Sequence, residues 1–257
     1  MPGISSALGG QISRPKGLTG LGWPRELALF LAAYAVYNLA RWVFVGDVDQ
    51  AQEHARWIVD LERDAGLAFE HSVQRALDSG ATAFVLSNAY LAAQLLVLPG
   101  SLIWLYRRSP EVYRVLRNTV LATWMIAVPI FAIFPVAPPR LAGLGLADTV
   151  SQQAGVALTG HSTMFYNPFA AVPSLHVGFA AAISVALGFA LRRRWAKALA
   201  LLWGPLVSVS VVATGNHYMF DIAAGLAVTG VGFAAGLLAS RVPRHIAWGR
   251  VQPGYSA

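Results

Sequence analysis

Six stretches of this chain are apolar over all or nearly all of the length that a helix needs to cross a bilayer, roughly 20 residues. Hydrophobic residues make up 56% of the chain and charged residues 12%, and the mean hydropathy is +0.54. These values lie outside the usual range of soluble domains. We therefore expect an all-α, polytopic membrane protein with six transmembrane helices in a bundle, at residues 26–45, 82–105, 118–136, 173–191, 197–215 and 219–240.

The chain divides into three expected parts. Residues 1–22 are rich in Gly and Ser and are expected to be a disordered cytoplasmic N-terminus, residues 23–240 to form the membrane domain, and residues 241–257 to be a cytoplasmic tail. Basic residues precede the first span, as in a signal peptide, but its apolar run is long and no small-x-small cleavage site follows. We expect a retained helix.

The net charge of +7 is distributed as short basic groups beside the spans. Such groups mark the cytoplasmic loops of membrane proteins, whereas a nucleic-acid surface would need a continuous basic stripe with stacking aromatic residues. We expect no nucleic-acid partner, and we expect both termini in the cytoplasm. This orientation places 14 of the 19 basic residues inside: Arg14, Lys16, Arg25, Arg107, Arg108, Arg114, Arg117, Arg192, Arg193, Arg194, Lys197, Arg241, Arg244 and Arg250.

Three segments then face the outside. Residues 46–80 are acidic, with apolar residues at helical spacing, which predicts short amphipathic helices on the membrane surface. This segment could shape a headgroup site, lie over the entrance or simply cover the bundle. The other two segments, residues 137–172 and the turn TGNHYMFD at 214–221, hold most of the interesting polar groups.

The turn before the last span carries an ionisable pair, His217 and Asp221. If the helix begins near Asn216, the two side chains lie on one face of it, about one turn apart. The aspartate then accepts a proton from one imidazole nitrogen and leaves the other as a nucleophile or base. The same face continues through Gly225 and Thr229, which let a neighbouring helix approach closely. A pair that merely anchors the helix end is the alternative, although ionisable groups at membrane depth are usually functional.

The fourth span begins with the sequence PSLH. Pro173 followed by Ser174 is a helix-start signal, with Ser174 a candidate cap, and His176 then falls in the first turn. Free backbone N–H groups and the positive end of the helix dipole favour a phosphate at such a start, and the Ser174 hydroxyl could donate to it. A capped helix with an interfacial histidine is the alternative.

The third span ends in FPVAPPR, whose prolines break the helix as it leaves the membrane. Arg140 then stands on a stiff loop at the outer surface. Its guanidinium suits bidentate binding of phosphate oxygens, although a lone arginine near a helix end also snorkels toward lipid headgroups. Five polar candidates all lie at the outer ends of helices, so we expect one extracytoplasmic site: Arg140, Ser174, His176, His217 and Asp221.

The motifs FPVAPPR, AAVPSLHVG and NHYMFDIAAG resemble those of the type 2 phosphatidic acid phosphatase superfamily of membrane lipid phosphatases. Among its branches they are most similar to the bacterial relatives of inositol phosphorylceramide synthase, over roughly residues 118–240. The resemblance implies that His217 is a nucleophile that forms a phosphohistidine and that Asp221 orients it. It also implies that His176 protonates the leaving group, and that Ser174 and Arg140 hold phosphate oxygens.

Three positions depart from the better-known phosphatases of that superfamily. Ile133, Leu141 and Val211 stand where those proteins carry Lys, Pro and Arg. One expected cation therefore remains instead of three, and the phosphate charge must also be met by helix dipoles and neutral donors. This favours a singly charged phosphodiester over a doubly charged monoester. The candidate neutral donors are Asn216, Asn167, Tyr166 and His161.

These features predict an enzyme of the cell (inner) membrane that acts on a phospholipid or a polyprenyl phosphate, with water or a polyol as acceptor. Nothing in the sequence calls for a metal or another cofactor, since no ligand cluster such as HExxH occurs. A transporter or flippase, and a scaffold or inactive enzyme, are the alternatives from other classes. A transporter is disfavoured because the polar groups gather at helix ends on one side.

Overall fold

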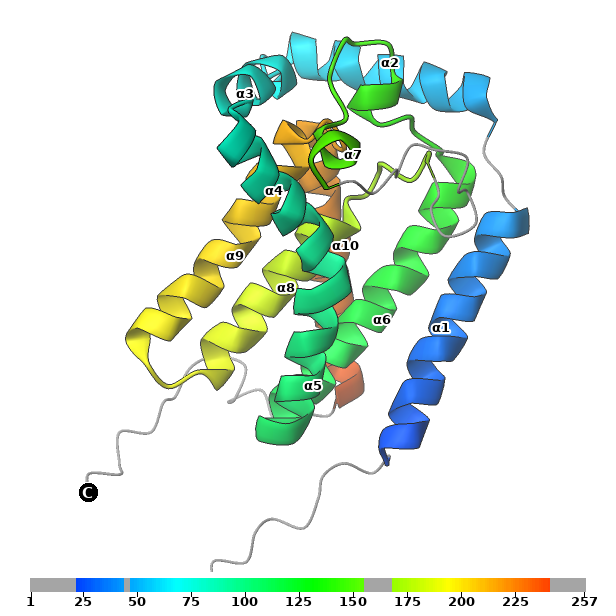
Figure 1. The fold of residues 1–257 in the computed structure, drawn as a ribbon. Helices are drawn as coiled ribbons and strands as arrows, with labels where there is room; N and C mark the ends of the chain where they lie inside the picture. Colours follow the sequence, from blue (N-terminus) through cyan, green and yellow to red (C-terminus); the bar gives the residue numbers. More distant parts are fainter. Residues whose placement is uncertain (1–21, 44–46, 155–167, 241–257) are drawn as a thin grey trace, which may run out of the picture.

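The computed structural model describes residues 22–43, 47–154 and 168–240, and these ranges are helical without a strand (Figure 1). The long helices lie side by side, while α2 and α3 cross one end of the bundle. The termini expected to be cytoplasmic, residues 1–21 and 241–257, lie outside the described residues. The bundle consists of α1 (Trp23–Val43), α4 (Gly80–Ala92), the π-helical turn η1 (Ala93–Val97), α5 (Leu98–Arg108), α6 (Pro110–Ile133), α8 (Leu175–Ala190), α9 (Arg194–Ala213) and α10 (Met219–Ser240). The end elements are α2 (Val48–Asp64), α3 (Glu70–Leu77), η2 (Pro139–Leu141) and α7 (Thr149–Ala154).

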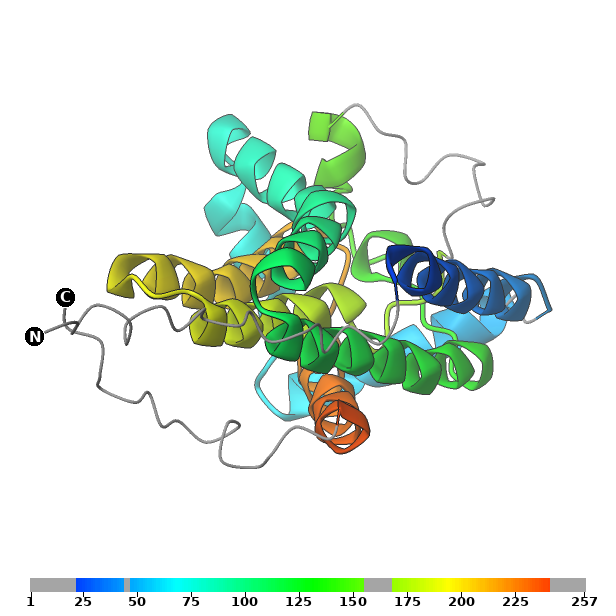
Figure 2. The same ribbon diagram turned by 90° about the horizontal axis from the view of Figure 1, so that it is seen from below.

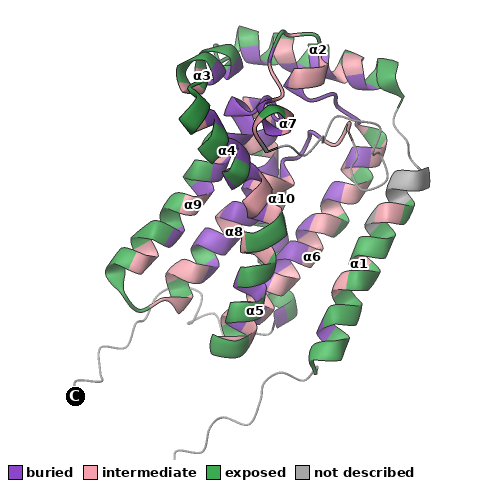
Figure 3. Cartoon of the chain, in the orientation of Figure 1, coloured by how far each residue is buried: buried purple, intermediate pink, exposed green. Residues whose placement is uncertain are grey.

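Four helical segments among the described residues are long and apolar enough to cross a membrane: Gly80–Arg108, Pro110–Ile133, Arg194–Ala213 and Met219–Ser240. The apolar helix α8 is shorter. Large apolar side chains such as Leu96 and Leu238 are about 70% exposed on the outer faces of these helices, and Figure 3 shows exposed residues along α1, α5 and α9. The expectation of an all-α polytopic membrane protein is confirmed, while the count of six spans stays a prediction.

The α6 helix begins at Pro110, earlier than the predicted start at residue 118. Because this first part of the helix contains charged residues, it did not qualify as part of an apolar span. Arg117 pairs with Glu26 of α1 at 2.6 Å, and the Tyr113 hydroxyl donates to the same carboxylate at 2.8 Å. Because these charges satisfy one another between two helices, they do not have to end the helix. Figure 2, from the end opposite α2, shows α1 beside α6 at one edge of the bundle.

One face of α10 consists of small or polar residues that are buried: Asp221, Gly225, Thr229, Gly232, Gly236 and Ser240. A Cβ at Gly225 would clash with the backbone of Ser174 at the start of α8, and a Cβ at Gly178 would clash with the Thr229 hydroxyl. Further along, Gly232 and Gly236 lie equally close to α6. The close helix approach predicted at Gly225 and Thr229 is therefore confirmed, and it brings the first turns of α8 and α10 together.

The surface helices expected in residues 46–80 are present as α2 and α3. The buried residues of α2 are Ala51, Ala55, Ile58 and Glu62, which recur at helical spacing on the face turned to the bundle. The apolar members of this face pack against Val136 and Tyr218. The segment thus covers the end of the bundle at which the polar motifs lie.

Substituting Gly225 with alanine should destabilise the protein by roughly 1–3 kcal/mol, because the added methyl meets the Ser174 backbone, which cannot yield without moving α8. Gly230→Ala is the matched control, since nothing lies within 4 Å of a Cβ there. Thermal unfolding in detergent, followed by tryptophan fluorescence, should give a lower melting temperature for Gly225→Ala only. Equal melting temperatures for the two variants would contradict the close packing.

Candidate active site

The loop after α6 brings Arg140 against the turn that precedes α10. The prolines that follow Ile133 end the helix, and η2 then carries Arg140. The backbone N–H of Arg140 donates to the Gly215 carbonyl at 2.9 Å. Arg140 and Gly215, which are far apart in the sequence, are thereby held side by side, as expected for one site.

The turn that carries His217 is shaped by the end of α9. Gly215 has a φ of +69°, a conformation that favours glycine. The backbone N–H groups of Asn216 and His217 both donate to the Val211 carbonyl at 3.1 Å and so close the end of α9. The next helix, α10, begins only at Met219. The helix thus coincides with the span predicted at residues 219–240, and His217 lies in the turn before it, so the condition that the helix begin near Asn216 is not met.

His217 and Asp221 are nevertheless paired. The His217 Nδ1 atom lies 3.0 Å from Asp221 Oδ2, and the backbone N–H of Tyr218 donates to the same oxygen at 2.9 Å. Because Oδ2 is already an acceptor, we assign the ring proton to Nδ1, which leaves the lone pair on Nε2. His217 is 5% exposed and Asp221 is fully buried. The carboxyl group thus fixes both the tautomer and the orientation of the imidazole.

Burial lowers the pKa of His217 from its usual 6.5 to about 3, and the positive charge of Arg140 adds to this effect. The nearby backbone of Ala171 acts in the opposite direction. The imidazole is therefore neutral at physiological pH. A neutral imidazole is the form that acts as a nucleophile.

The second histidine lies in the first turn of α8. Ser174 is the N-cap, and its Oγ accepts the Val177 N–H at 3.5 Å, as predicted from the sequence. The His176 ring stacks on Tyr90 of α4 at a centroid distance of 4.0 Å, and its centroid lies 6.0 Å from that of His217. This separation lets the two rings approach one small group from different sides.

Arg140 is the cation of this site, and its side chain is only 1% exposed. Its Nη1 donates to Asn216 Oδ1 at 2.5 Å, and its Nε lies 3.5 Å from Asp148 Oδ2. The carboxylate of Asp148 offsets part of the guanidinium charge. The site therefore presents less positive charge to a substrate than Arg140 alone would supply.

The structure brings together six residues singled out from the sequence: Arg140, Ser174, His176, Asn216, His217 and Asp221. Asn216 differs from its expected role as a phosphate donor. Its amide nitrogen donates to the Thr214 carbonyl and hydroxyl oxygens, and its carbonyl oxygen accepts from Arg140. It is engaged in orienting Arg140. The other three expected donors, Asn167, Tyr166 and His161, lie outside the described residues.

Sequence reasoning missed the polar residues of α2 and α3 that bond the loops of the site. The Gln52 amide donates to the Leu141 carbonyl at 2.7 Å. The Gln74 amide nitrogen donates to the carbonyls of Ala147 and Ala213, at 3.0 and 3.1 Å. A structural role for Glu62 could have been predicted from the sequence, since an acidic residue on the apolar face of an amphipathic helix needs a buried partner.

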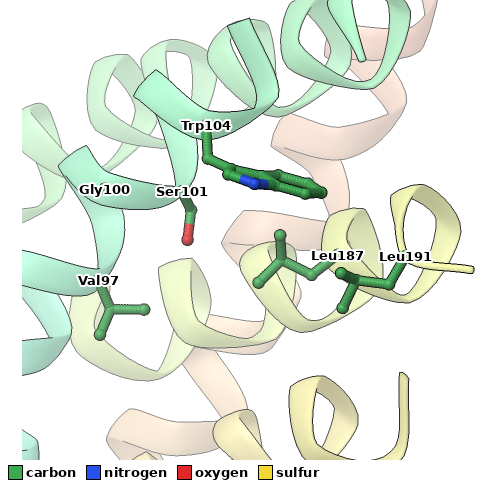
Figure 4. A pocket seen from close by; sticks show the side chains of 6 residues that line it. All are labelled: Val97, Gly100, Ser101, Trp104, Leu187 and Leu191. Atoms are coloured by element: carbon green, nitrogen blue, oxygen red, sulfur yellow. The ribbon is translucent and has the colours of Figure 1, made fainter. Parts of the chain in front are cut away.

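A hollow of 350 Å³ lies elsewhere, between α5 and α8 (Figure 4). It is lined by Val97, Gly100, Ser101, Trp104, Leu187 and Leu191. Leu187 follows His176 along α8 by roughly 17 Å at the rise of an α-helix. This apolar hollow is therefore separate from the histidines.

The fold and this site define an all-α membrane protein. Its three polar motifs lie at helix ends, and they bring His176, His217 and the Asp221 carboxyl group together. A family model of the PAP2 superfamily matches residues 56–235, well over half of the chain. The chain therefore belongs to the PAP2 superfamily, which the histidine motifs resemble. Neither the curated proteins nor the solved structures gave a match. The superfamily generally consists of phosphatases and phosphotransferases, and membership supports a function of this type.

The low pKa of His217 gives a direct prediction. In protein labelled with ¹⁵N-histidine and held in detergent, the His217 ring should stay neutral down to about pH 4, whereas free histidine protonates near 6.5. The resonance is assigned by its disappearance in His217→Gln. Protonation of this ring at or above about pH 6 would contradict the buried, Arg140-facing environment.

Proposed function

We propose that this protein is a membrane lipid phosphatase or phosphotransferase that works through a phosphohistidine at His217. The observation that carries the proposal is the buried His217–Asp221 pair, with a neutral imidazole, opposite His176 in a chain of the PAP2 superfamily. An activated nucleophile needs such an orienting group within hydrogen-bond reach. Transport or a purely structural role would not require this alignment.

In the first step His217 Nε2 attacks phosphorus, and the bond from phosphorus to the leaving oxygen breaks. His176 donates a proton to that oxygen, so the leaving group departs as an alcohol. Asp221 stabilises the positive charge on the phosphorylated imidazole. Arg140 and the N-terminus of α8 neutralise the charge on the nonbridging oxygens.

In the second step water or a polyol hydroxyl attacks the phosphohistidine, and His176 takes its proton. The bond between phosphorus and nitrogen breaks, and His217 returns to its neutral form. Water yields hydrolysis and a polyol yields transfer. The mechanism needs no metal, and among the described residues no group of three or more His, Asp or Glu side chains is arranged to hold one.

The modest positive charge of the site favours a singly charged phosphodiester. Arg140 is ion-paired with Asp148, while Val211 and Ile133 stand at positions where better-known members carry cations. Val211 is fully buried, and Ile133 is 75% exposed on the outer surface. A phosphomonoester dianion would leave more negative charge without a partner. We therefore favour headgroup transfer of the inositol phosphorylceramide synthase type over monoester hydrolysis.

The proposed setting is the inner membrane, crossed six times, with cytoplasmic termini and the site facing outward. The basic residues at the helix ends away from the site, such as Arg107 and Arg108 of α5 and Arg194 of α9, support this orientation. A substrate would then enter laterally from the outer leaflet. The partners follow from this setting: a phospholipid or polyprenyl phosphate, a polyol acceptor and the bilayer itself.

Purified protein in detergent with EDTA should hydrolyse a lipid phosphodiester to a phosphomonoester and an alcohol, or transfer its phosphoryl group to an added polyol, and faster than it acts on the matching monoester. His217→Ala and His176→Ala should each lower the rate by on the order of a thousandfold, and His71→Ala, at an exposed position on α3, should not. A ³²P-labelled substrate should leave an acid-labile label on the protein that His217→Ala lacks. Full activity in both His217→Ala and His176→Ala would exclude this mechanism.

The orientation has its own test, made simple because the chain has no cysteine. Asp78→Cys, in the exposed turn between α3 and α4, should react with an impermeant maleimide in intact cells. Arg193→Cys, in the exposed turn between α8 and α9, should react only after the cells are opened. The reverse labelling pattern would overturn the proposed topology.

A further inference from the structure

Two buried carboxyl groups from the surface helices lie against the first turn of α10. Glu62 of α2 is 3% exposed and Glu70 of α3 is 7% exposed. The Phe220 N–H donates to Glu62 Oε1 at 2.6 Å, and the Met219 N–H donates to Glu70 Oε1 at 3.2 Å. These N–H groups belong to the first turn of a helix, where no intrahelical acceptor exists.

The turn is held by carboxyl groups at three successive residues. The N–H of Tyr218 bonds Asp221, that of Met219 bonds Glu70, and that of Phe220 bonds Glu62. The first of these acceptors, Asp221 Oδ2, is also the partner of His217. A shift of this turn would therefore move the Asp221 carboxyl relative to the imidazole.

Glu62 and Glu70 are neighbours, because they accept the N–H groups of two successive residues, Phe220 and Met219. Two ionised carboxylates at such close range repel each other, which favours a proton on one of them. Burial, followed by the interaction with Glu70, raises the pKa of Glu62 from 4.5 to about 8, against the opposing effect of the Phe220 N–H. The titratable groups that face Glu62 are Glu70 on α3, Asp221 on α10 and Tyr218 in the preceding turn.

We propose that Glu62 and Glu70 are positioning residues of the reaction, which share one proton and hold the first turn of α10 so that Asp221 stays aligned with His217. This inference rests on the proposed function and assigns a role to the α2–α3 segment. The shared proton limits the negative charge beside Asp221. Loss of that proton leaves both Glu62 and Glu70 ionised beside one turn, and their repulsion weakens the alignment.

Kinetics separate this role from a structural one. Glu62→Ala leaves the Phe220 N–H without a partner and should lower kcat by roughly tenfold or more, with KM nearly unchanged. Glu62→Gln mimics the protonated acid, since its amide can donate to Glu70 while its carbonyl accepts from Phe220. It should recover most of that kcat and should lack the fall in rate that is expected of the wild type above about pH 8. Glu53→Gln, the same change at an exposed position of α2, is the matched control.

A pH–rate profile of Glu62→Gln identical to that of the wild type and Glu53→Gln would overturn the proposal, and so would a wild-type kcat in Glu62→Ala. Either result leaves the proposed function intact as long as His217→Ala is inactive. If the wild type itself transfers no phosphate from any lipid, the proposed function fails instead, and the positioning role fails with it.

Stability tests the shared proton without any activity. A raised pKa stabilises the folded state fully below the ordinary value of 4.5, and this stabilisation is lost as the pH rises through about 8. The melting temperature of the wild type and of Glu53→Gln should therefore fall between these pH values. That of Glu62→Gln should fall less. Parallel curves for all three proteins would show that no proton is shared and would overturn the inference.

Discussion

The close approach of α10 to the start of α8 determines how the site is assembled. Gly225 lies against the Ser174 backbone, and one turn earlier the Ser174 N–H donates to the Asp221 carbonyl at 3.1 Å. The cap of one helix and the carboxyl-bearing turn of the other are thus bonded through their main chains. This contact also positions His176 and His217, because each lies within a few residues of it. Backbone packing therefore determines where the side chains of the site lie.

Low polarity around the site sets the state of its ionisable groups. In a buried environment a charge is tolerated only with a partner, so the imidazole of His217 remains neutral while Arg140 is paired with Asp148. The same physics makes the carboxyl of Glu62 hold its proton. The site therefore carries little net charge, although it contains many ionisable residues.

The motifs in the sequence were sufficient to predict the membrane class, the start of α8 at Ser174 and the packing face of α10. These features depend on local signals, namely an apolar run, a Pro-Ser cap and small residues at helical spacing. His217 lies before α10 and not on it, because the Val211 carbonyl accepts the Asn216 and His217 N–H groups, which no local pattern reveals. The roles of Gln74 and Glu70 depend on contacts across more than 70 residues, and such pairings cannot be seen in a single sequence.

The stacking of Tyr90 on His176 has a consequence for the geometry of proton transfer. An imidazole gives and takes protons only in the plane of its ring, and the parallel contact with Tyr90 fixes that plane. Tyr90 belongs to α4, a helix that supplies none of the reacting groups. In the proposed mechanism, α4 therefore sets the direction from which the leaving oxygen departs and the acceptor hydroxyl arrives, so that both must pass along the edge of the His176 ring.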